Sequence, residues 1–367
     1  MGEKKSKYEI PGDLSEWMTK LPPRLKAEPL NKLGIPGTHI SASYSIHRGS
    51  PISGEHPEYL QIGPIPIHRR PTRHNWTRTQ YSSVYEQLEH GVRFIDLHVL
   101  LYIYQDKYKE RIHEYYCVNG QLANTVNFEI DMISMFLEKH PEEVVIIYVS
   151  YGHNFILTKD SEAFMDIIVK KFHRCMCPPQ DTIPSLDFMR KHAYQVILFS
   201  QVRSKEFKHY FDRVWPEGQL QVFEKRTTNG AEIINYFESV KEDRNPEKFC
   251  VHYAALYPTL EFMLDHRRES LYDAQKDLAD RLWSWIRNPE RVGGEKGVNI
   301  IAVDYMVKAY PDLPARMIEG SYEVFLTRFA LSECKLPVER RVTEDAARPD
   351  SSKSNSSRSD SAASQNR

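Results

Sequence analysis

Long apolar runs are missing from this 367-residue chain, and so is an excess of charge of either sign. No uncharged apolar stretch approaches the roughly 18 residues that cross a bilayer as a helix. The formal net charge is −1, so no overall field attracts nucleic acid. Hydrophobic residues still make up 41% of the sequence, which is enough for a large core. These features predict a globular protein that neither spans a membrane nor binds nucleic acid.

Cysteine is also scarce in this chain. The five cysteines are an odd number, and their spacing fits no disulfide framework. Cys175 and Cys177 lie too close together for a standard zinc pair. Reduced thiols in a cytosolic protein explain this usage most simply, and residues 1–13 lack the apolar segment of a signal peptide. We therefore expect a cytoplasmic protein and leave peripheral contact with membranes open.

A Gly-x-Gly-x-x-Gly motif after a strand is absent, which argues against a dinucleotide-binding fold. Strand-like and helix-like segments instead alternate along the chain. The strand-like segments are residues 92–103, 115–119, 144–150, 195–200, 219–223, 249–254 and 298–304, and the main helix-like ones are 125–140, 161–175 and 260–287. In 125–140, the residues predicted to face the core are Phe128, Met132, Met135 and Phe136. About eight strand candidates in roughly 300 residues favour a closed α/β barrel over an open sheet.

The composition divides the chain into an extension, a domain and a tail. Residues 1–30 are a charged, proline-rich N-terminal extension, in which Trp17 and Met18 predict a short helix packed against the body. Residues 31–335 contain the alternating segments and form the predicted barrel domain. Residues 342–367 are rich in serine and poor in apolar side chains, so we expect this tail to be disordered.

A long segment inside the domain, residues 46–80, has neither a helical nor a strand-like period. A loop of this length in a compact domain is usually functional or disordered. Its basic residues are His47, Arg48, His68, Arg69, Arg70, Arg73, His74 and Arg78, with Trp76 among them. We expect this loop to contact anionic lipid headgroups; a solvated insertion is the alternative.

Residues 33–39 read Leu-Gly-Ile-Pro-Gly-Thr-His. Pro36 fixes φ and Gly37 permits a sharp turn, so Thr38 and His39 are predicted to lie in a loop at a strand end. A histidine in such a place can reach a bound substrate. The histidine is therefore a candidate functional residue.

The segment 92–103 alternates apolar and polar side chains. Ile95 and Leu97 fall on one face, whereas Phe94, Asp96 and His98 fall on the other. Such a strand fits a barrel whose outer face packs against helices and whose inner face holds a site.

The ends of parallel barrel strands meet at one mouth, so we expect His39, Asp96, His98 and Asp304 to converge there. An aspartate near a histidine fixes its tautomer and raises its basicity. This combination suits general acid–base chemistry on a phosphate or an ester, although the spacing does not specify the reaction.

Five segments, in this order, resemble the X domain of phosphatidylinositol-specific phospholipase C. They are Ile-Pro-Gly-Thr-His at 35–39, Thr-Gln at 79–80, and the stretches 87–97, 136–146 and 299–304. The resemblance covers about residues 30–330 and is greatest to small proteins that lack C2, PH and EF-hand modules. It implies an irregular TIM-type (β/α) barrel of the kind found in phospholipase C-like phosphodiesterases.

The family cleaves a phosphodiester by attack of the inositol 2-hydroxyl on phosphorus. The resemblance implies that His39 is the general base, Asp304 its steering carboxylate, and Asp96 the acidic residue of the second motif. Three positions depart from the family pattern. Ile40 replaces an Asp or Asn, His98 replaces the arginine of metal-free members, and Asn119 replaces the second catalytic histidine.

These departures remove the general-acid half of the site. An asparagine cannot usefully donate a proton, and general acid help is typically worth about 10²–10⁴-fold in rate. Ile40 and His98 leave too few oxygen ligands for calcium, so we expect no metal and no cofactor. His153, after the strand at 144–150, is the candidate replacement acid. The predicted catalytic residues are His39 and Asp304, and the predicted substrate-binding residues are Asp96, His98, Asn119 and His153.

Two main interpretations remain open. The first is a phosphoric diester hydrolase of the phospholipase C type, acting slowly in lipid metabolism or signalling. The second is an inactive X domain that binds phosphoinositide headgroups or a protein partner. Another phosphodiester or glycerophosphodiester substrate is a third, weaker possibility.

Overall fold

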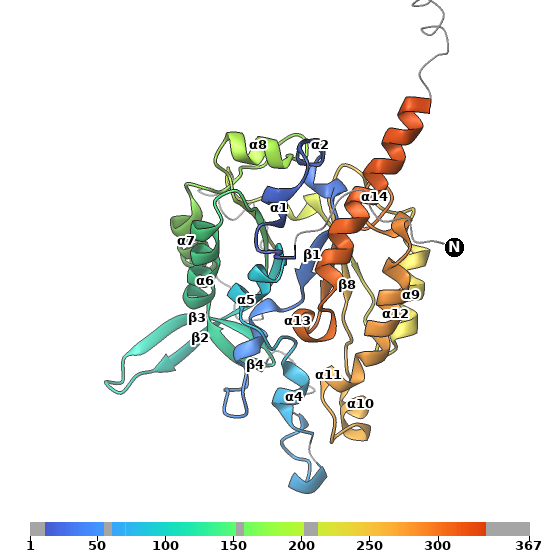
Figure 1. The fold of residues 1–367 in the computed structure, drawn as a ribbon. Helices are drawn as coiled ribbons and strands as arrows, with labels where there is room; N and C mark the ends of the chain where they lie inside the picture. The colour runs from blue at the N-terminus through green and yellow to red at the C-terminus, as the bar shows by residue number, and fades with distance from the viewer. Residues whose placement is uncertain (1–11, 55–60, 70, 152–157, 202–211, 335–367) are drawn as a thin grey trace, which may run out of the picture. The chain divides into compact units, whose positions relative to one another are not determined.

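Nine strands join into one sheet in the part of the chain that the computed structural model describes, residues 12–54, 61–69, 71–151, 158–201 and 212–334 (Figure 1). The chain divides into a compact unit over residues 1–326 and a short unit over residues 327–367, and the fold below is that of the first unit. The predicted serine-rich tail, Arg70 and His153 lie outside the described residues.

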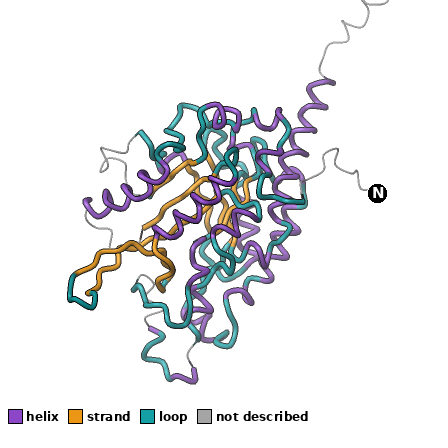
Figure 2. The backbone as a smooth tube through the Cα atoms, turned by 60° about the vertical axis from the view of Figure 1, so that its left-hand side comes forward, coloured by secondary structure: helices purple, strands orange, loops and turns teal. Residues whose placement is uncertain are grey.

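Seven of these strands are parallel and lie in the order β6–β5–β2–β1–β9–β8–β7. Their bounds are β1 Ile35–Thr38, β2 Phe94–Gln105, β5 Val145–Tyr151, β6 Val196–Ser200, β7 Leu220–Glu224, β8 Phe249–Ala254 and β9 Ile300–Val303. Helices follow the strands along the chain and cover the outer side of the sheet (Figures 1 and 2). The predicted α/β class of the TIM type is confirmed.

The barrel is open on one side. Within the described residues, β6 and β7 stand at the two ends of the strand order and form no ladder with each other. Trp215 occupies this place: its backbone N–H donates to the Leu198 carbonyl at 2.8 Å, and its indole packs on Phe199 and Phe249. A bulky aromatic side chain thus fills the seam that a closed ladder would occupy. The expected closed barrel is therefore corrected to an irregular, open one.

Side chains of the parallel strands alternate between the barrel interior and the helical layer. Phe94 packs inside with Ile35 and Ile300, whereas Ile95 and Leu97 pack outside in the cluster that includes the helices. The predicted sidedness of β2 is confirmed. Asp96 accordingly shares the inner face with Phe94.

Helix α6 (Val126–Lys139) begins at Thr125, whose side chain accepts a hydrogen bond from the Phe128 N–H. Its predicted buried stripe is wrong at Phe128, which is 46% exposed, and at Met135, which is 53% exposed, whereas Phe136 is buried as predicted. The buried apolar positions are Val126, Ile130, Ile133, Phe136 and Leu137. These apolar residues recur with the helical period, and they face the sheet.

The predicted helix over 260–287 is three helices: α10 (Leu260–Asp265), α11 (Leu271–Ala274) and α12 (Lys276–Ile286). Ser270 starts α11 with a reciprocal cap to Asp273, so the chain changes direction before it. The remaining helices are α1 Trp17–Lys20, α2 Pro23–Lys26, α4 Arg73–Thr77, α5 Val84–Glu89, α7 Thr158–Phe172, α8 Leu186–Lys191, α9 Gly230–Ser239, α13 Met306–Ala309 and α14 Leu313–Cys334. No helix among the described residues is long and apolar enough to cross a membrane.

The N-terminal helices belong to the domain core. Trp17 and Met18 of α1 are buried in the same cluster as the barrel interior. Arg93, just before β2, forms a fully buried ion pair with Glu143, just before β5, at 2.7 Å. Glu143 also accepts from the backbone N–H groups of Met18 and Thr19. The boundary predicted at residue 31 therefore does not separate these helices from the domain.

Strand β2 continues beyond the barrel as a hairpin (Figure 2). Residues 94–99 pair with β5, and residues 99–105 pair antiparallel with β3 (Arg111–Asn119), which in turn pairs with β4 (Gln121–Thr125). The strand predicted at 115–119 is present, but it belongs to this antiparallel part. The return strand brings Asn119 back toward the barrel.

Candidate functional site

The candidate site is centred on two neighbouring strand ends. Thr38 of β1 pairs with Val303 of β9, so the next residues, His39 and Asp304, emerge side by side. The His39 Nδ1 lies 2.8 Å from the Asp304 Oδ1, and both side chains are buried. The structure thus brings the two predicted catalytic residues together. Thr38 lies inside the ladder, so the expectation that it sits in a loop is corrected.

Thr79 and Gln80 hold these strand ends in place. The Gln80 side chain donates to the carbonyls of His39 and Val303, at 3.1 and 2.9 Å, and so links β1 to β9. The Thr79 hydroxyl donates to the His39 carbonyl at 3.0 Å. In the sequence, this Thr-Gln pair is only one part of the family resemblance. In the structure, the two side chains position His39.

Asp96 of β2 is attached to the same turn. Its carboxylate accepts from the Ile40 N–H at 3.2 Å, and its own N–H donates to the Ser41 hydroxyl at 2.9 Å. Ile40 has a left-handed backbone, with φ of 41°, which a β-branched residue adopts only under strain. The Asp or Asn found here in the family tolerates this conformation better. The structure thus brings Asp96 to the His39 turn, as predicted.

His98 and Asn119 are directed to other partners. The His98 Nδ1 lies 2.8 Å from the hydroxyl of Ser150 on β5. The Asn119 side chain donates to the Thr77 carbonyl at 2.7 Å. Asn119 therefore binds the segment that leads to Thr79, and its contacts are those of a structural amide. The predicted substrate contacts of these two residues stay predictions.

Three residues near His39 were not predicted from the sequence: Tyr257, Glu224 and Tyr253. The Tyr257 hydroxyl, beyond the end of β8, is 3.4 Å from the His39 Nε2. It also donates to the Glu224 carboxylate at the end of β7. The Tyr253 ring packs edge-on against the imidazole, with centroids 5.4 Å apart. Both Glu224 and Tyr257 follow apolar strand segments, so the strand-end rule that found Asp304 could also have found them.

The electrostatics of the site are dominated by carboxylates around one imidazole. Burial lowers the pKa of His39, but Asp304, Asp96 and Glu224 raise it by more, so its net pKa lies above the usual 6.5. Burial raises the pKa of Asp304, and His39 opposes that rise. Burial likewise raises the pKa of Asp96, against His39 and the Ile40 N–H. These carboxylates can hold a proton on the His39 imidazole and fix the orientation of the ring. No metal-binding group of three or more His, Cys, Asp or Glu residues occurs in the described ranges.

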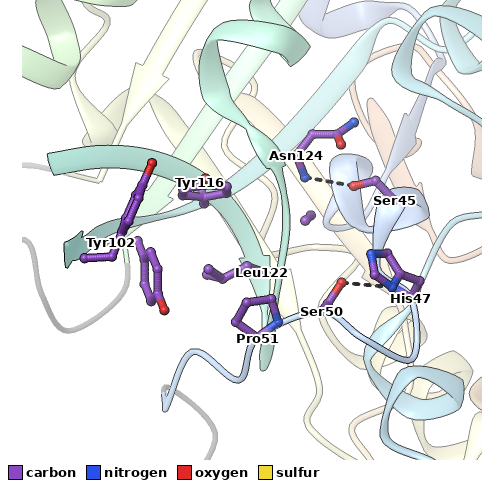
Figure 3. Close-up of a pocket in the computed structure, with 10 residues that line it drawn as sticks. Ser45, His47, Ser50, Pro51, Tyr102, Tyr116, Leu122 and Asn124 are labelled. Atoms are coloured by element: carbon purple, nitrogen blue, oxygen red, sulfur yellow. Dashed lines mark hydrogen bonds between the residues drawn. The ribbon is translucent and has the colours of Figure 1, made fainter. Parts of the chain in front are cut away.

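A pocket lies beside the β2–β3 hairpin, away from His39 (Figure 3). Its volume is about 410 Å³. The residues that line it are Ser45, His47, Ser50, Pro51, Tyr102, Tyr104, Tyr116, Leu122, Ala123 and Asn124. None of these ten is a predicted site residue. Asn124 also donates to the buried Glu129 of α6 at 2.8 Å, which links the rim of this pocket to a buried carboxyl group.

The fold matches known structures. Phosphatidylinositol-specific phospholipase C from Staphylococcus aureus, solved as a mutant, superposes with a TM-score of 0.60 at 16% identity, over 85% of this chain and 98% of that one. The enzyme of the same name from Listeria monocytogenes gives a TM-score of 0.55 at 16% identity, over 84% and 98%. The class of fold is thus that of the barrel phosphatidylinositol phospholipases C.

Sequence comparison places the chain within that class. The PI-PLC X domain family model, described as PI-PLC X 1, matches residues 66–215. PI-PLC X domain-containing protein 1 of Homo sapiens is 31% identical over 295 residues, which are 79% of this chain and 88% of that protein. PI-PLC X domain-containing protein 3 of Danio rerio is 28% identical over 300 residues, 80% and 89% of the two chains. The chain belongs to the PI-PLC X domain-containing protein family.

Proposed function

We propose that this protein acts on the phosphodiester of an inositol lipid as a phospholipase C-type hydrolase, with His39 as the general base. The observation that carries this proposal is the 2.8 Å contact between His39 and Asp304 at the strand ends of an X-family barrel. Asp304 holds the Nδ1 side of the ring, so the Nε2 side is the one that takes a proton from the attacking hydroxyl. The family membership supplies the substrate class.

The same geometry supports slow turnover. Where the family has a second histidine, Asn119 donates to a carbonyl and has no proton to give the leaving group. Where the family has an Asp or Asn, Ile40 offers only its backbone N–H to Asp96. General acid help is typically worth about 10²–10⁴-fold, so cleavage should be slower than in complete members by about that factor.

A second candidate function rests on the same departures. A site with a buried imidazole and no general acid is suited to holding an inositol phosphate headgroup without cleaving it. The substrate is a lipid in either case, so we propose a cytoplasmic protein that meets membranes peripherally through the residues around the barrel mouth.

The decisive experiment is incubation of the protein with labelled phosphatidylinositol in mixed micelles. Cyclic inositol phosphate and diacylglycerol should appear slowly. The His39→Gln variant should release none. His192 is an exposed histidine just after α8, and His192→Gln should behave as the parent. Release that survives in His39→Gln would refute the assigned base. Saturable headgroup binding without release would favour the second candidate. The absence of both binding and release would refute both candidates.

A further inference from the structure

The hydroxyl of Tyr257 lies between His39 and Glu224. Its oxygen is 3.4 Å from the His39 Nε2, and its proton goes to the Glu224 carboxylate. Glu224 is held in turn by Arg226, whose Nε lies 3.2 Å from the carboxylate and whose guanidinium lies 5.3 Å from the centre of the Tyr257 ring. The nitrogen that a substrate hydroxyl would approach is therefore covered by a fixed phenol.

The hydrogen bonds around His39 require a particular protonation state of its ring. A carboxylate only accepts, and a phenol has a single proton. Because Tyr257 gives that proton to Glu224, it presents an oxygen lone pair to the His39 Nε2. Asp304 presents another acceptor to Nδ1. Only an imidazolium, which carries protons on both nitrogens, can donate in both directions.

The charges around the His39 ring also favour the imidazolium. The ionisable groups that face His39 are Asp304 just after β9, Asp96 on β2, Glu224 at the end of β7, the Tyr253 phenol on β8 and the Tyr257 phenol beyond it. Burial raises the pKa of Tyr257 well above its usual value, and Glu224 raises it further, so the phenol keeps its proton. The three carboxylates favour a positive charge on the ring between them.

We propose that Tyr257 and Glu224 are positioning residues that cover the Nε2 of His39 and hold its ring as the imidazolium until a headgroup hydroxyl displaces the phenol. On displacement, the Nε2 proton passes to water, and the freed nitrogen can then accept the proton of the bound hydroxyl. The covered state is a property of the ligand-free protein, whereas the displacement step rests on the function proposed above. His39 therefore cannot act as a base until a headgroup occupies the site.

Nitrogen-15 histidine spectroscopy of the full-length chain tests the covered state directly, because ring-nitrogen shifts report protonation and tautomer. His39→Gln identifies the His39 signals. At about pH 7 the parent should show a charged ring. In Tyr257→Phe and Glu224→Gln the ring should lose its Nε2 proton at a lower pH than in the parent and become the neutral tautomer with its proton on Nδ1. Tyr253→Phe is the matched control, because the Tyr253 ring also packs on His39. That contact is between the two rings, and phenylalanine keeps it. Its His39 should titrate as in the parent.

A neutral His39 in the parent at about pH 7 would overturn the proposal, and so would identical titration in the parent and Tyr257→Phe. These results do not depend on turnover, so they separate this inference from the proposed function. In the lipid assay, Tyr257→Phe should release about 2- to 10-fold more product at about pH 7, as expected for the loss of one hydrogen bond. The difference should shrink as the pH rises and the parent ring loses its proton. Lower release from Tyr257→Phe would count against the covering role.

Discussion

Glu129 is a fully buried carboxyl group in the first turn of α6, and it should make the stability of the fold depend on pH. Its Oε1 accepts from the Tyr44 hydroxyl and the Asn124 amide, both at 2.8 Å, while its Oε2 is buried without a recorded hydrogen bond. Burial raises the pKa of Glu129 from 4.5 to about 7, against these two hydrogen bonds. Tyr44 lies in the short 3-10 helix Ser41–Ser45, which follows His39 closely in the chain, so the carboxyl group also supports the site.

A raised pKa means that the folded state binds this proton more tightly than the unfolded state. The stabilisation is fully present below about pH 4.5 and is lost as the pH rises to about 7. At about 1.4 kcal/mol per pKa unit, the loss is about 3 kcal/mol. Glutamine has nearly the same shape, and its carbonyl oxygen can accept from Tyr44 and Asn124. Glu129→Gln should therefore match the parent near pH 4.5 and exceed its stability by up to about 3 kcal/mol at pH 8.

Urea unfolding of both proteins between pH 4.5 and pH 8 measures this difference. Glu138→Gln, an exposed position on the same helix, is the control and should leave the pH profile of the parent unchanged. Parallel stability profiles for the parent and Glu129→Gln would show that folding does not raise the pKa of Glu129, and the reasoning from burial would then be wrong.

Three further predictions concern the core, the missing acid and the rim. Arg93→Ala should lower the free energy of unfolding in urea by about 3–5 kcal/mol, because it strands the buried Glu143 charge. Ile40→Asp combined with Asn119→His should raise cyclic inositol phosphate release by about 10²-fold or more, because a general acid needs both a donor and a partner. Exchanging the exposed Arg48 and Arg69 for Ser should weaken binding to anionic liposomes in sedimentation assays, by roughly 1 kcal/mol for each residue.

Each of these three predictions has a control or a result that would contradict it. Arg281→Ala removes an exposed helical pair with Asp277 and should cost about 0.5 kcal/mol or less. Asn119→His alone should not restore efficient cleavage, and full restoration by that single change would refute a coupled loss. Unchanged liposome binding after the loss of both rim arginines would identify the loop as a solvated insertion. The pKa of His74 in this loop is lowered by burial and by Arg78 and Arg48, so it adds less charge near neutral pH than the sequence suggested.

Local patterns in the sequence were sufficient for the parallel strands and for the sidedness of β2, but they did not predict β4. The alternation in residues 92–103 correctly assigned Phe94 to the interior and Ile95 to the helical layer, because strand side chains alternate by covalent geometry. The rule that chemistry follows buried parallel strands also found His39 and Asp304, which lie 265 positions apart. The predicted α6 stripe was wrong at Phe128 and Met135, because the helical period of the buried apolar residues turns these two positions away from the sheet.

The sequence by itself thus determined the α/β alternation, the inner face of β2 and the strand-end histidine and aspartate, since each follows from neighbouring residues and backbone geometry. Only the tertiary structure decided that Trp215 fills an open seam, that Gln80 ties two strand ends together, and that Tyr257 covers the base nitrogen. These are contacts between segments distant in the chain, and they depend on which strands become neighbours. No local periodicity carries that information, because a side chain's hydrogen-bond partner is selected by the packing of the whole barrel.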